Sequence, residues 1–454
     1  METNTRMPID RIHSFARCAA LFALCAAVLP GCPHRSTAIE RALDFLARNQ
    51  VTAQFNTEIG VNGFRDYEGN WPQHFYFEDF PILRIPDASP FMVAFVHHAL
   101  THINAESLPG LGLDSSDQLT AQTMRIHAVD FLQRFESPAN TLDAGTYGFW
   151  PENPDLNAEE PLLAEVFLEI LQGPVLMGSR TPLNLAVYPN ALALPSDADV
   201  TGAVYAALED HARLDGGPTV NEPFEQFFAD WRDDGTVPRR LNPDWLPDAS
   251  GAFFTWLNYQ ESSVAPVPND VDLVVNATVL YTLGRSGHLN TPGVNEAVAL
   301  INNVTAQGIH RTAFDEITDY YPDNFAFEYF VTRAFFEGNV IDLQPAVEIL
   351  ADDIEQSAQT NTAGDTFWDR GDPHLNTAFA VLTLLNAGRD TPLIRGGIDY
   401  LLAEQNPQTG GWDESVFFIA RVDSGRQVNW ASESLTTAIA LEALCRYKLD
   451  SVSN

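Results

Sequence analysis

Apolar residues along this chain recur at the three- and four-residue spacing of helices, and the predicted helices are of two alternating kinds. A helix of the first kind ends in a glutamine and runs into a Gly-x-Trp turn. Its clearest copy places Tyr400 and Leu401 on the apolar stripe, Gln405 in the last turn, and Gly410 and Trp412 after it. Such self-similarity predicts stacked helical units that bury their apolar faces against their neighbours. Further copies cover residues 42–50 with Trp71, 128–136 with Trp150 and, more weakly, 346–356 with Trp368.

Helices of the second kind are apolar almost all round, which is the pattern of a helix that is packed on every side. Each opens near an acidic residue, because a carboxylate at a helix start accepts hydrogen bonds from free backbone N–H groups and meets the positive end of the helix dipole. These starts lie near Asp87, Asp197, Asp270, Asp323, Asp372 and Glu433. Helices of the first kind start between them, near Thr37, Gln122, Pro223, Gly293, Pro345 and Arg395.

Six helices of each kind predict an all-α fold, an (α/α)6 toroid in which six outer helices surround six inner ones. An additional helix is expected from Ala158. Strand signals are scarce, and stretches rich in Pro, Gly and Asp indicate long loops at the ends of the ring. No linker divides residues 32–454, so we predict one toroid domain there, preceded by a separate segment at residues 1–31.

The charge of the chain is strongly one-sided, with 61 acidic against 25 basic residues and a formal net charge of -36. A surface of this sign repels nucleic acid and anionic lipid headgroups, so we predict no nucleic-acid partner. Solubility in a saline setting is the simplest explanation of the charge. An acidic funnel that attracts a cationic ligand is the alternative explanation.

The first residues have the pattern of an export signal. Arg11 and Arg17 precede an apolar run at residues 18–30, which has the length of a signal-peptide core and is too short to span a bilayer. The run ends in Leu29-Pro30-Gly31-Cys32, which resembles the cleavage box of bacterial lipoproteins. In that family the cysteine becomes the lipidated first residue of the mature protein. We therefore predict export, a lipid anchor at Cys32 and attachment to a membrane of a bacterial cell envelope, with plain secretion as the alternative.

Metal and cofactor sites are not predicted. Cys18 and Cys25 would leave with the signal segment and Cys445 would be alone, so neither an intramolecular disulfide nor a cysteine-based zinc site is expected. His97 and His98 are adjacent in a helix, where neighbouring side chains point in different directions, which favours core or surface roles. No calcium-loop spacing occurs, although the chain is acidic.

Two motifs resemble squalene-hopene cyclases and related terpene cyclases. The segment from Tyr400 to Trp412 is similar to their glutamine-tryptophan repeat, in which the two residues tie the end of an outer helix to the neighbouring repeat. The stretch SDADVTGAVYAAL, residues 196–208, is similar to the Asp-x-Asp-Asp-Thr-Ala motif that holds the proton donor of class II cyclases. The resemblance implies that Asp199 is the general acid, preceded by Asp197 and followed by Thr201, with Val200 in place of the last aspartate.

The implied chemistry is proton-initiated cyclisation or isomerisation of an apolar isoprenoid-type substrate. Protonation of an alkene needs a carboxylic acid that stays protonated in a water-poor pocket, and the resulting carbocation is stabilised by aromatic faces. We predict Asp199 as the acid, with Asp197 and Asp272 as polar partners in the ring. The candidate substrate-binding aromatics are Trp256, Tyr320, Tyr321, Phe325, Trp368 and Trp430.

Two other functions remain open. Many toroids of this type cleave polysaccharides with paired carboxylates, which Asp270, Asp272, Asp319 and Glu328 could supply. In that case Asp270 would cap its helix and Asp272 would face the cavity. The other alternative is a non-catalytic toroid that binds a lipid or a protein. A cyclase needs an enclosed aromatic cavity around Asp199, a polysaccharide enzyme needs an open groove with two facing carboxylates, and a binding protein needs neither.

Overall fold

The computed structural model describes residues 37–52, 68–137, 144–149, 196–257, 269–421 and 427–453. The chain divides into two compact units, Met1–Thr37 and Ala38–Asn454, and every element below belongs to the second. The predicted signal segment, Cys32, Trp150 and the additional helix from Ala158 all lie outside the described residues. No helix in the described ranges is both long and apolar enough to cross a membrane.

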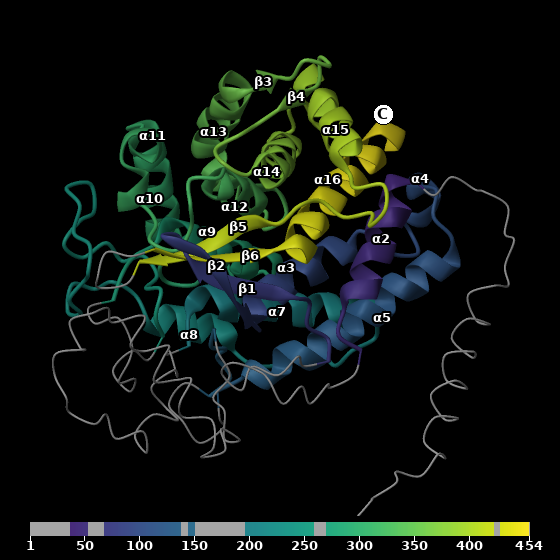
Figure 1. Cartoon of the computed structure of the whole chain (residues 1–454). Helices are drawn as coiled ribbons and strands as arrows, with labels where there is room; N and C mark the ends of the chain where they lie inside the picture. The colour runs from purple at the N-terminus through teal and green to yellow at the C-terminus, as the bar shows by residue number, and fades with distance from the viewer. Residues whose placement is uncertain are drawn as a thin grey trace, which may run out of the picture. The chain divides into compact units, whose positions relative to one another are not determined.

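Six helices form a closed cycle of contacts, in which each packs on the next and the last packs on the first (Figure 1). Their starts match the six predicted inner helices to within a few residues, which confirms the α-rich fold. Because each lies between two others of the cycle and also meets an outer helix or the sheet, it is apolar all round. In chain order these helices are α3 (Pro90–Thr101), α7 (Ala198–Leu214), α9 (Leu273–Arg285), α12 (Ala326–Phe336), α14 (Pro373–Asn386) and α16 (Glu433–Ser453).

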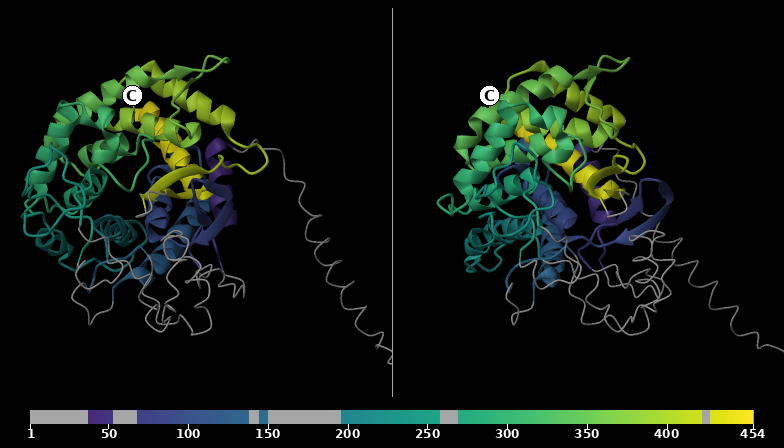
Figure 2. Two further views of the ribbon diagram at one scale, coloured as in Figure 1. Left: turned by 60° about the vertical axis from the view of Figure 1, so that its left-hand side comes forward. Right: turned by 90° about the vertical axis from the view of Figure 1, so that its left-hand side faces the viewer.

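Helices of the other kind pack outside this cycle, and the turned views of Figure 2 show the two sets side by side. Five begin where the sequence pattern predicts. The exception is α5, predicted to begin near Gln122, which starts at Ser115 because Asp114 and Asp117 form a capping box there. The set comprises α2 (Ala38–Asn49), α5 (Ser115–Leu132), α8 (Phe224–Asp230), α10 (Val294–Ala306), α13 (Gln344–Ser357) and α15 (Pro392–Glu404). Short helices complete the chain: α4 (Leu108–Leu111), η2 (Gln133–Phe135), α11 (Ile309–Thr312), η6 (Phe314–Glu316) and η7 (Ile341–Leu343).

The tryptophans of the repeat cap the outer helices. The indole N–H of Trp412 donates to the Leu401 carbonyl at 2.8 Å, near the end of α15. This carbonyl also accepts from the Gln405 N–H at 3.1 Å, so the indole is a second donor to a group in the last turn of the helix. Two further indoles do the same at the ends of α2 and α13, namely Trp71 to Leu46 at 2.9 Å and Trp368 to Ile354 at 2.7 Å.

The glutamines link one outer helix to the next. The side-chain amide of Gln405, after α15, donates to the Ala38 carbonyl of α2 at 2.9 Å. The amide of Gln50, after α2, donates to the Met124 carbonyl of α5 at 2.9 Å. These contacts confirm that the repeat motif ties neighbouring helical units together, so its glutamines have a structural role.

A four-stranded antiparallel sheet was not predicted. Its strand order is β2 (Phe80–Asp87), β1 (Gln73–Phe77), β6 (Gln427–Ser432) and β5 (Ser415–Arg421), and a separate pair is formed by β3 (Gln359–Thr360) and β4 (Thr366–Phe367). The central pairing joins Phe75 to Trp430, which lie far apart in the sequence, so no local pattern reports it. Through Phe417, β5 packs onto α3, α12 and α14, which brings the sheet against the inner helices.

Candidate functional site

Asp199 lies in the first turn of α7, where its side chain is buried. The residue two positions earlier, Asp197, caps the helix and accepts a hydrogen bond from the Val200 N–H at 2.6 Å. The two aspartates differ in their contacts because of helix geometry. The N-cap carboxylate reaches the free backbone N–H groups, whereas the side chain at N2 projects away from them. Asp197 is therefore occupied by the helix start, and Asp199 is free to contact other elements.

The carboxyl group of Asp199 has one partnered and one unpartnered oxygen. The hydroxyl of Tyr321, from the loop before α12, donates to Oδ2. Oδ1 has no hydrogen-bond partner among the residues that the structure describes. Burial raises the pKa of Asp199 to about 6, whereas the nearby Thr278 and Tyr321 side chains act to lower it. The group therefore titrates in a range where it can both hold and release a proton.

Aromatic side chains surround the partner of this acid. The ring of Tyr321 lies 5.3 Å from that of Phe330 and 6.1 Å from those of Phe91, Phe417 and Phe418, measured between centroids. We call these five residues the aromatic cluster. It combines α3, α12, β5 and the loop before α12, so it exists only when distant parts of the chain meet. Aromatic faces carry negative quadrupole charge and attract cations.

Asp272 is a structural residue of α9. Its Oδ1 accepts from the N–H groups of Val274 at 2.8 Å and Val275 at 3.1 Å, and its Oδ2 accepts from the Thr318 hydroxyl at 2.6 Å and the Asp319 N–H at 2.9 Å. Burial raises the pKa of Asp272, whereas these four donors favour the ionised form. The expectation that Asp270 caps this helix is thus wrong, because Asp272 is the N-cap.

Asp270 instead ends a chain of hydrogen bonds. The indole of Trp256 donates to the Tyr320 hydroxyl at 3.0 Å, and that hydroxyl donates to Asp270 Oδ2 at 2.7 Å. Thr255 donates to the other oxygen. Tyr320 also stacks on Phe418 with an interplanar angle of 12°, so Trp256 and Tyr320 reach the edge of the aromatic cluster.

The other carboxylates of the polysaccharide alternative are bound to arginines. Asp319 forms an ion pair with Arg240, and Glu328 lies 3.4 Å from Arg370. Together with the hydrogen bonds of Asp270 and Asp272, these contacts assign the four carboxylates to structural networks. None of these contacts leaves two free carboxylates facing one another.

Three further predicted aromatics differ in their surroundings. Trp430 packs on Phe418 at 5.0 Å and donates to Asp87 at 2.6 Å, so it also borders the aromatic cluster. Phe325 has a positive φ of 68° at the start of α12, and the Arg370 guanidinium lies 3.7 Å from its ring centroid. Trp368 is one of the helix-capping indoles described above. The structure therefore brings Tyr320, Tyr321, Trp256 and Trp430 toward one region and gives Phe325 and Trp368 other contacts.

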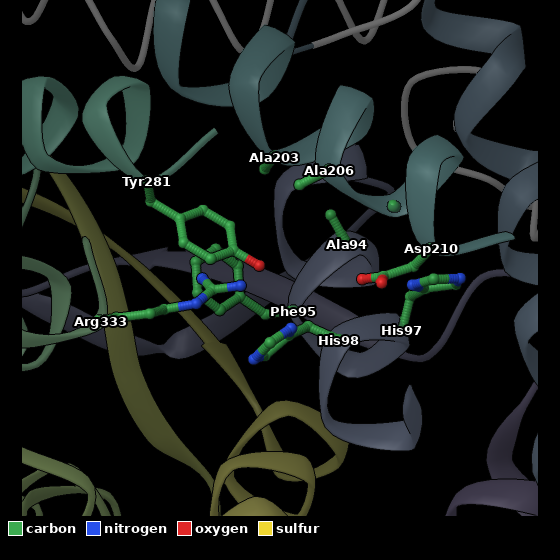
Figure 3. A pocket seen from close by; sticks show the side chains of 10 residues that line it. Ala94, Phe95, His97, His98, Ala203, Ala206, Asp210, Tyr281 and Arg333 are labelled. Atoms are coloured by element: carbon green, nitrogen blue, oxygen red, sulfur yellow. The ribbon is translucent and has the colours of Figure 1, made fainter. Parts of the chain in front are cut away.

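Two small cavities occur among the described residues, and each has room for about one water molecule. One adjoins Asp270 and Asp272. The other lies between α3, α7, α9 and α12, where Figure 3 shows His97 beside Asp210 and the Arg333 guanidinium beside the ring of Tyr281. Neither of these two cavities is lined by Asp199 or Tyr321.

The sequence analysis did not identify a second group of side chains, which are of the types that bind metal ions. His98, His102, Glu337 and Glu442 place their ligand-type atoms within 4.8 Å of one another. His98 and His102 are one helical turn apart, at the end of α3 and its C-cap, so their side chains point in similar directions. The sequence analysis considered only the adjacent pair His97 and His98. The spacing of four residues was a visible signal, but the two glutamates come from other helices.

Comparison with known proteins supports the fold alone. No protein-family model matches the sequence, and no curated protein matches it. A solved structure of a variant of the type II terpene cyclase MstE from Scytonema, in complex with its substrate geranylgeranyl dihydroxybenzoate, is 15% identical, with a TM-score of 0.50 over 90% of this chain and 96% of that one. The apo form of MstE is 14% identical over 90% and 97% of the two chains, with a TM-score of 0.49. The described part of the chain thus has a terpene-cyclase-like fold.

Proposed function

We propose that the protein is an (α/α)6 toroid of the terpene-cyclase type that protonates an apolar isoprenoid-like substrate and so starts its cyclisation or isomerisation. The observation that carries the proposal is the Asp199 carboxyl group, which is buried, titrates near pH 6, has an unpartnered Oδ1 and lies beside the aromatic cluster through Tyr321. The likeness in fold to MstE, whose structure holds an isoprenoid substrate, agrees with this class of ligand.

The proposed step needs only groups of this chain. Asp199 carries its proton on Oδ1, the O–H bond breaks, and the proton forms a C–H bond with one carbon of an alkene while the positive charge develops on the other. Tyr321 stabilises the carboxylate that remains, because its hydroxyl already donates to Oδ2. The rings of the aromatic cluster stabilise the carbocation until it loses a proton.

The test compares wild type with Asp199→Asn after incubation with squalene and with polyprenols, followed by lipid extraction and mass spectrometry. Asp372→Asn is the matched control, because Asp372 also stands at an inner-helix start and accepts a hydrogen bond from the Val416 N–H at 3.0 Å. We expect a product of altered structure and unchanged mass from wild type and the control, and none from Asp199→Asn. Product that persists in Asp199→Asn would refute the assignment of the acid.

A second candidate function is a non-catalytic binding toroid. The two cavities described above each hold about one water molecule and neither is lined by Asp199, whereas a cyclase needs an enclosed cavity around that residue. A binding toroid needs no cavity at Asp199. Lipid that is retained unchanged and equally by wild type and Asp199→Asn would support this function over the cyclase.

We also propose export and lipidation at Cys32, on the sequence pattern alone. An anchor at this position would hold the protein at a membrane, where apolar substrates partition. Growth of producing cells with a labelled fatty acid tests the proposal: label should enter wild type and be absent from Cys32→Ser. Equal labelling of the two proteins would exclude the anchor.

A further inference from the structure

The cluster His98, His102, Glu337 and Glu442 lies at the ends of inner helices opposite the ends that carry Asp199 and Asp272. His98 and His102 belong to the last turn of α3 and its C-cap, Glu337 follows α12, and Glu442 lies within α16. The side chains of His98 and Glu442 are 7% and 0% exposed, and those of His102 and Glu337 are 17% and 15% exposed. Three inner helices thus contribute to one largely buried group of ligand-type side chains.

The distances within the cluster are close to the edges of a metal coordination shell. His98 Nε2 lies 3.4 Å from Glu337 Oε2 and 3.6 Å from Glu442 Oε1, and His102 Nε2 lies 4.0 Å from Glu442 Oε1. Four ligands at ~2.0–2.2 Å from a tetrahedral zinc ion are about 3.3–3.6 Å apart. The two His98 distances fall in this range, and the four ligand-type atoms, all within 4.8 Å of one another, would move closer together around a bound ion.

The histidines add a second observation. Nδ1 of His98 is buried without a hydrogen-bond partner among the described residues, and Nε2 of His98 and of His102 face glutamate oxygens at the longer distances given above. Buried polar atoms without a well-formed hydrogen bond are unfavourable, so several in one place need an explanation. A cation at the centre of the cluster would bind Nε2 of both rings.

Neighbouring groups hold the two carboxylates in position. The Tyr329 hydroxyl lies 3.2 and 3.3 Å from the two oxygens of Glu442, and Arg446 donates to Glu337 Oε1 at 3.0 Å. Glu337 Oε2 is left facing His98, with Arg333 Nε at 3.7 Å. Such outer contacts orient metal ligands. Arg333 and Arg446 also offset the charge of the glutamates, so a proton shared by His98 and the carboxylates is the competing occupant.

We propose that His98, His102, Glu337 and Glu442 bind one Zn²⁺ ion as a structural site. Imidazole and carboxylate ligands both suit zinc, and four protein ligands leave no open position for substrate. The site joins α3, the first helix of the inner cycle, to α16, the last, and to α12. Zinc would therefore lock the contact between two helices that are more than 300 residues apart in the sequence. The proposal is independent of acid catalysis at Asp199.

The first experiment uses the whole wild-type protein. After treatment with a chelator and dialysis, we expect one equivalent of Zn²⁺ to bind, to raise the melting temperature, and to be replaced by Co²⁺ with the visible absorption of a tetrahedral complex. No binding and an unchanged melting temperature would overturn the proposal and assign the cluster to the proton-sharing ion network. This readout needs no variant, so it does not depend on whether a substitution folds.

Variants then locate the ion. Glu442→Gln and His102→Gln should lose the Zn²⁺-dependent rise in melting temperature, whereas His97→Gln should keep it, because His97 is buried on the same helix but lies beside Asp210 (Figure 3). Tyr329→Phe should weaken zinc affinity by about 10-fold, since it removes an outer contact and no ligand. A rise that persists in Glu442→Gln and His102→Gln would place the ion elsewhere and refute the site.

Discussion

The inner helices hold acidic side chains in two different ways. At the helix starts, Asp197 and Asp272 accept hydrogen bonds from backbone N–H groups. Farther along, Glu337 follows the end of α12 and Glu442 lies within α16, and both are held by arginine, tyrosine and histidine side chains. An acidic residue at a helix start therefore needs no special function, whereas a buried one beyond the start needs a partner side chain. Asp199 and Glu328, each in a first turn, differ from the caps because each has one oxygen without a hydrogen-bond partner among the described residues.

The largest effect should follow from breaking the cluster of His98, His102, Glu337 and Glu442. Glu442→Ala removes the buried carboxylate that Tyr329 contacts and leaves His98 with Glu337, so we expect the free energy of unfolding to fall by about 3–5 kcal/mol. The matched control is Asp352→Ala, whose exposed ion pair with Arg389 should contribute about 0–1 kcal/mol. Urea unfolding of the three proteins measures both. Equal losses would remove the contrast between a buried and an exposed pair.

The pH dependence of stability tests whether Asp199 is protonated in the folded protein. Its folded-state pKa of about 6 exceeds its unfolded value of 3.8, so the stability contributed by its protonated form is fully present below pH 3.8 and is lost as the pH rises through 6. Asparagine stays neutral, so from pH 4.5 to pH 8 Asp199→Asn should gain about 2 kcal/mol relative to wild type. Urea unfolding at the two pH values checks this. A difference that does not change with pH would mean that Asp199 is already ionised at pH 4.5.

Removal of a helix cap should have a smaller effect on stability at pH 7. Asp197→Ala removes the acceptor for the Val200 N–H, and we expect a loss of about 1–2 kcal/mol at pH 7. Asp197→Asn should recover most of the loss, because its amide oxygen can accept the same bond. If asparagine behaved like alanine, the charge of Asp197 would matter more than its hydrogen bond.

The smallest effect concerns the partner of the candidate acid. Tyr321→Phe removes the hydroxyl that donates to Asp199, and this hydrogen bond lowers the pKa of the carboxyl group. The pKa of Asp199 should therefore rise, by less than about one unit for a hydrogen bond of ~1 kcal/mol. The ¹³C chemical shift of the Asp199 carboxyl, followed by NMR through a pH titration, reports the midpoint. An unchanged or lower midpoint would show that Tyr321 does not stabilise the carboxylate.

The candidate site was only partly predictable. The resemblance around residues 196–208 singled out Asp199, and aromatic content singled out Tyr321, but nothing local indicated that the two side chains meet. The same holds for His98 and Glu442, which are 344 positions apart by their numbering. Trp368 was taken for a substrate contact although it caps a helix, because a buried tryptophan has the same sequence signature in either role.

The sequence by itself determined the alternation of two helix kinds and most of their starts, because these depend on periodicity, capping and turns between nearby residues. The partners of the glutamines, such as Ala38 for Gln405, lie far along the chain. Tertiary structure alone decided the sheet that joins β1 to β6, the partnering of Asp199 with Tyr321, and the meeting of two histidines with two glutamates. The physical reason is that local hydrogen bonding shapes a helix from its own residues. Burial, by contrast, brings together side chains from remote elements. The pKa values of these side chains and their capacity to bind a ligand depend on those neighbours.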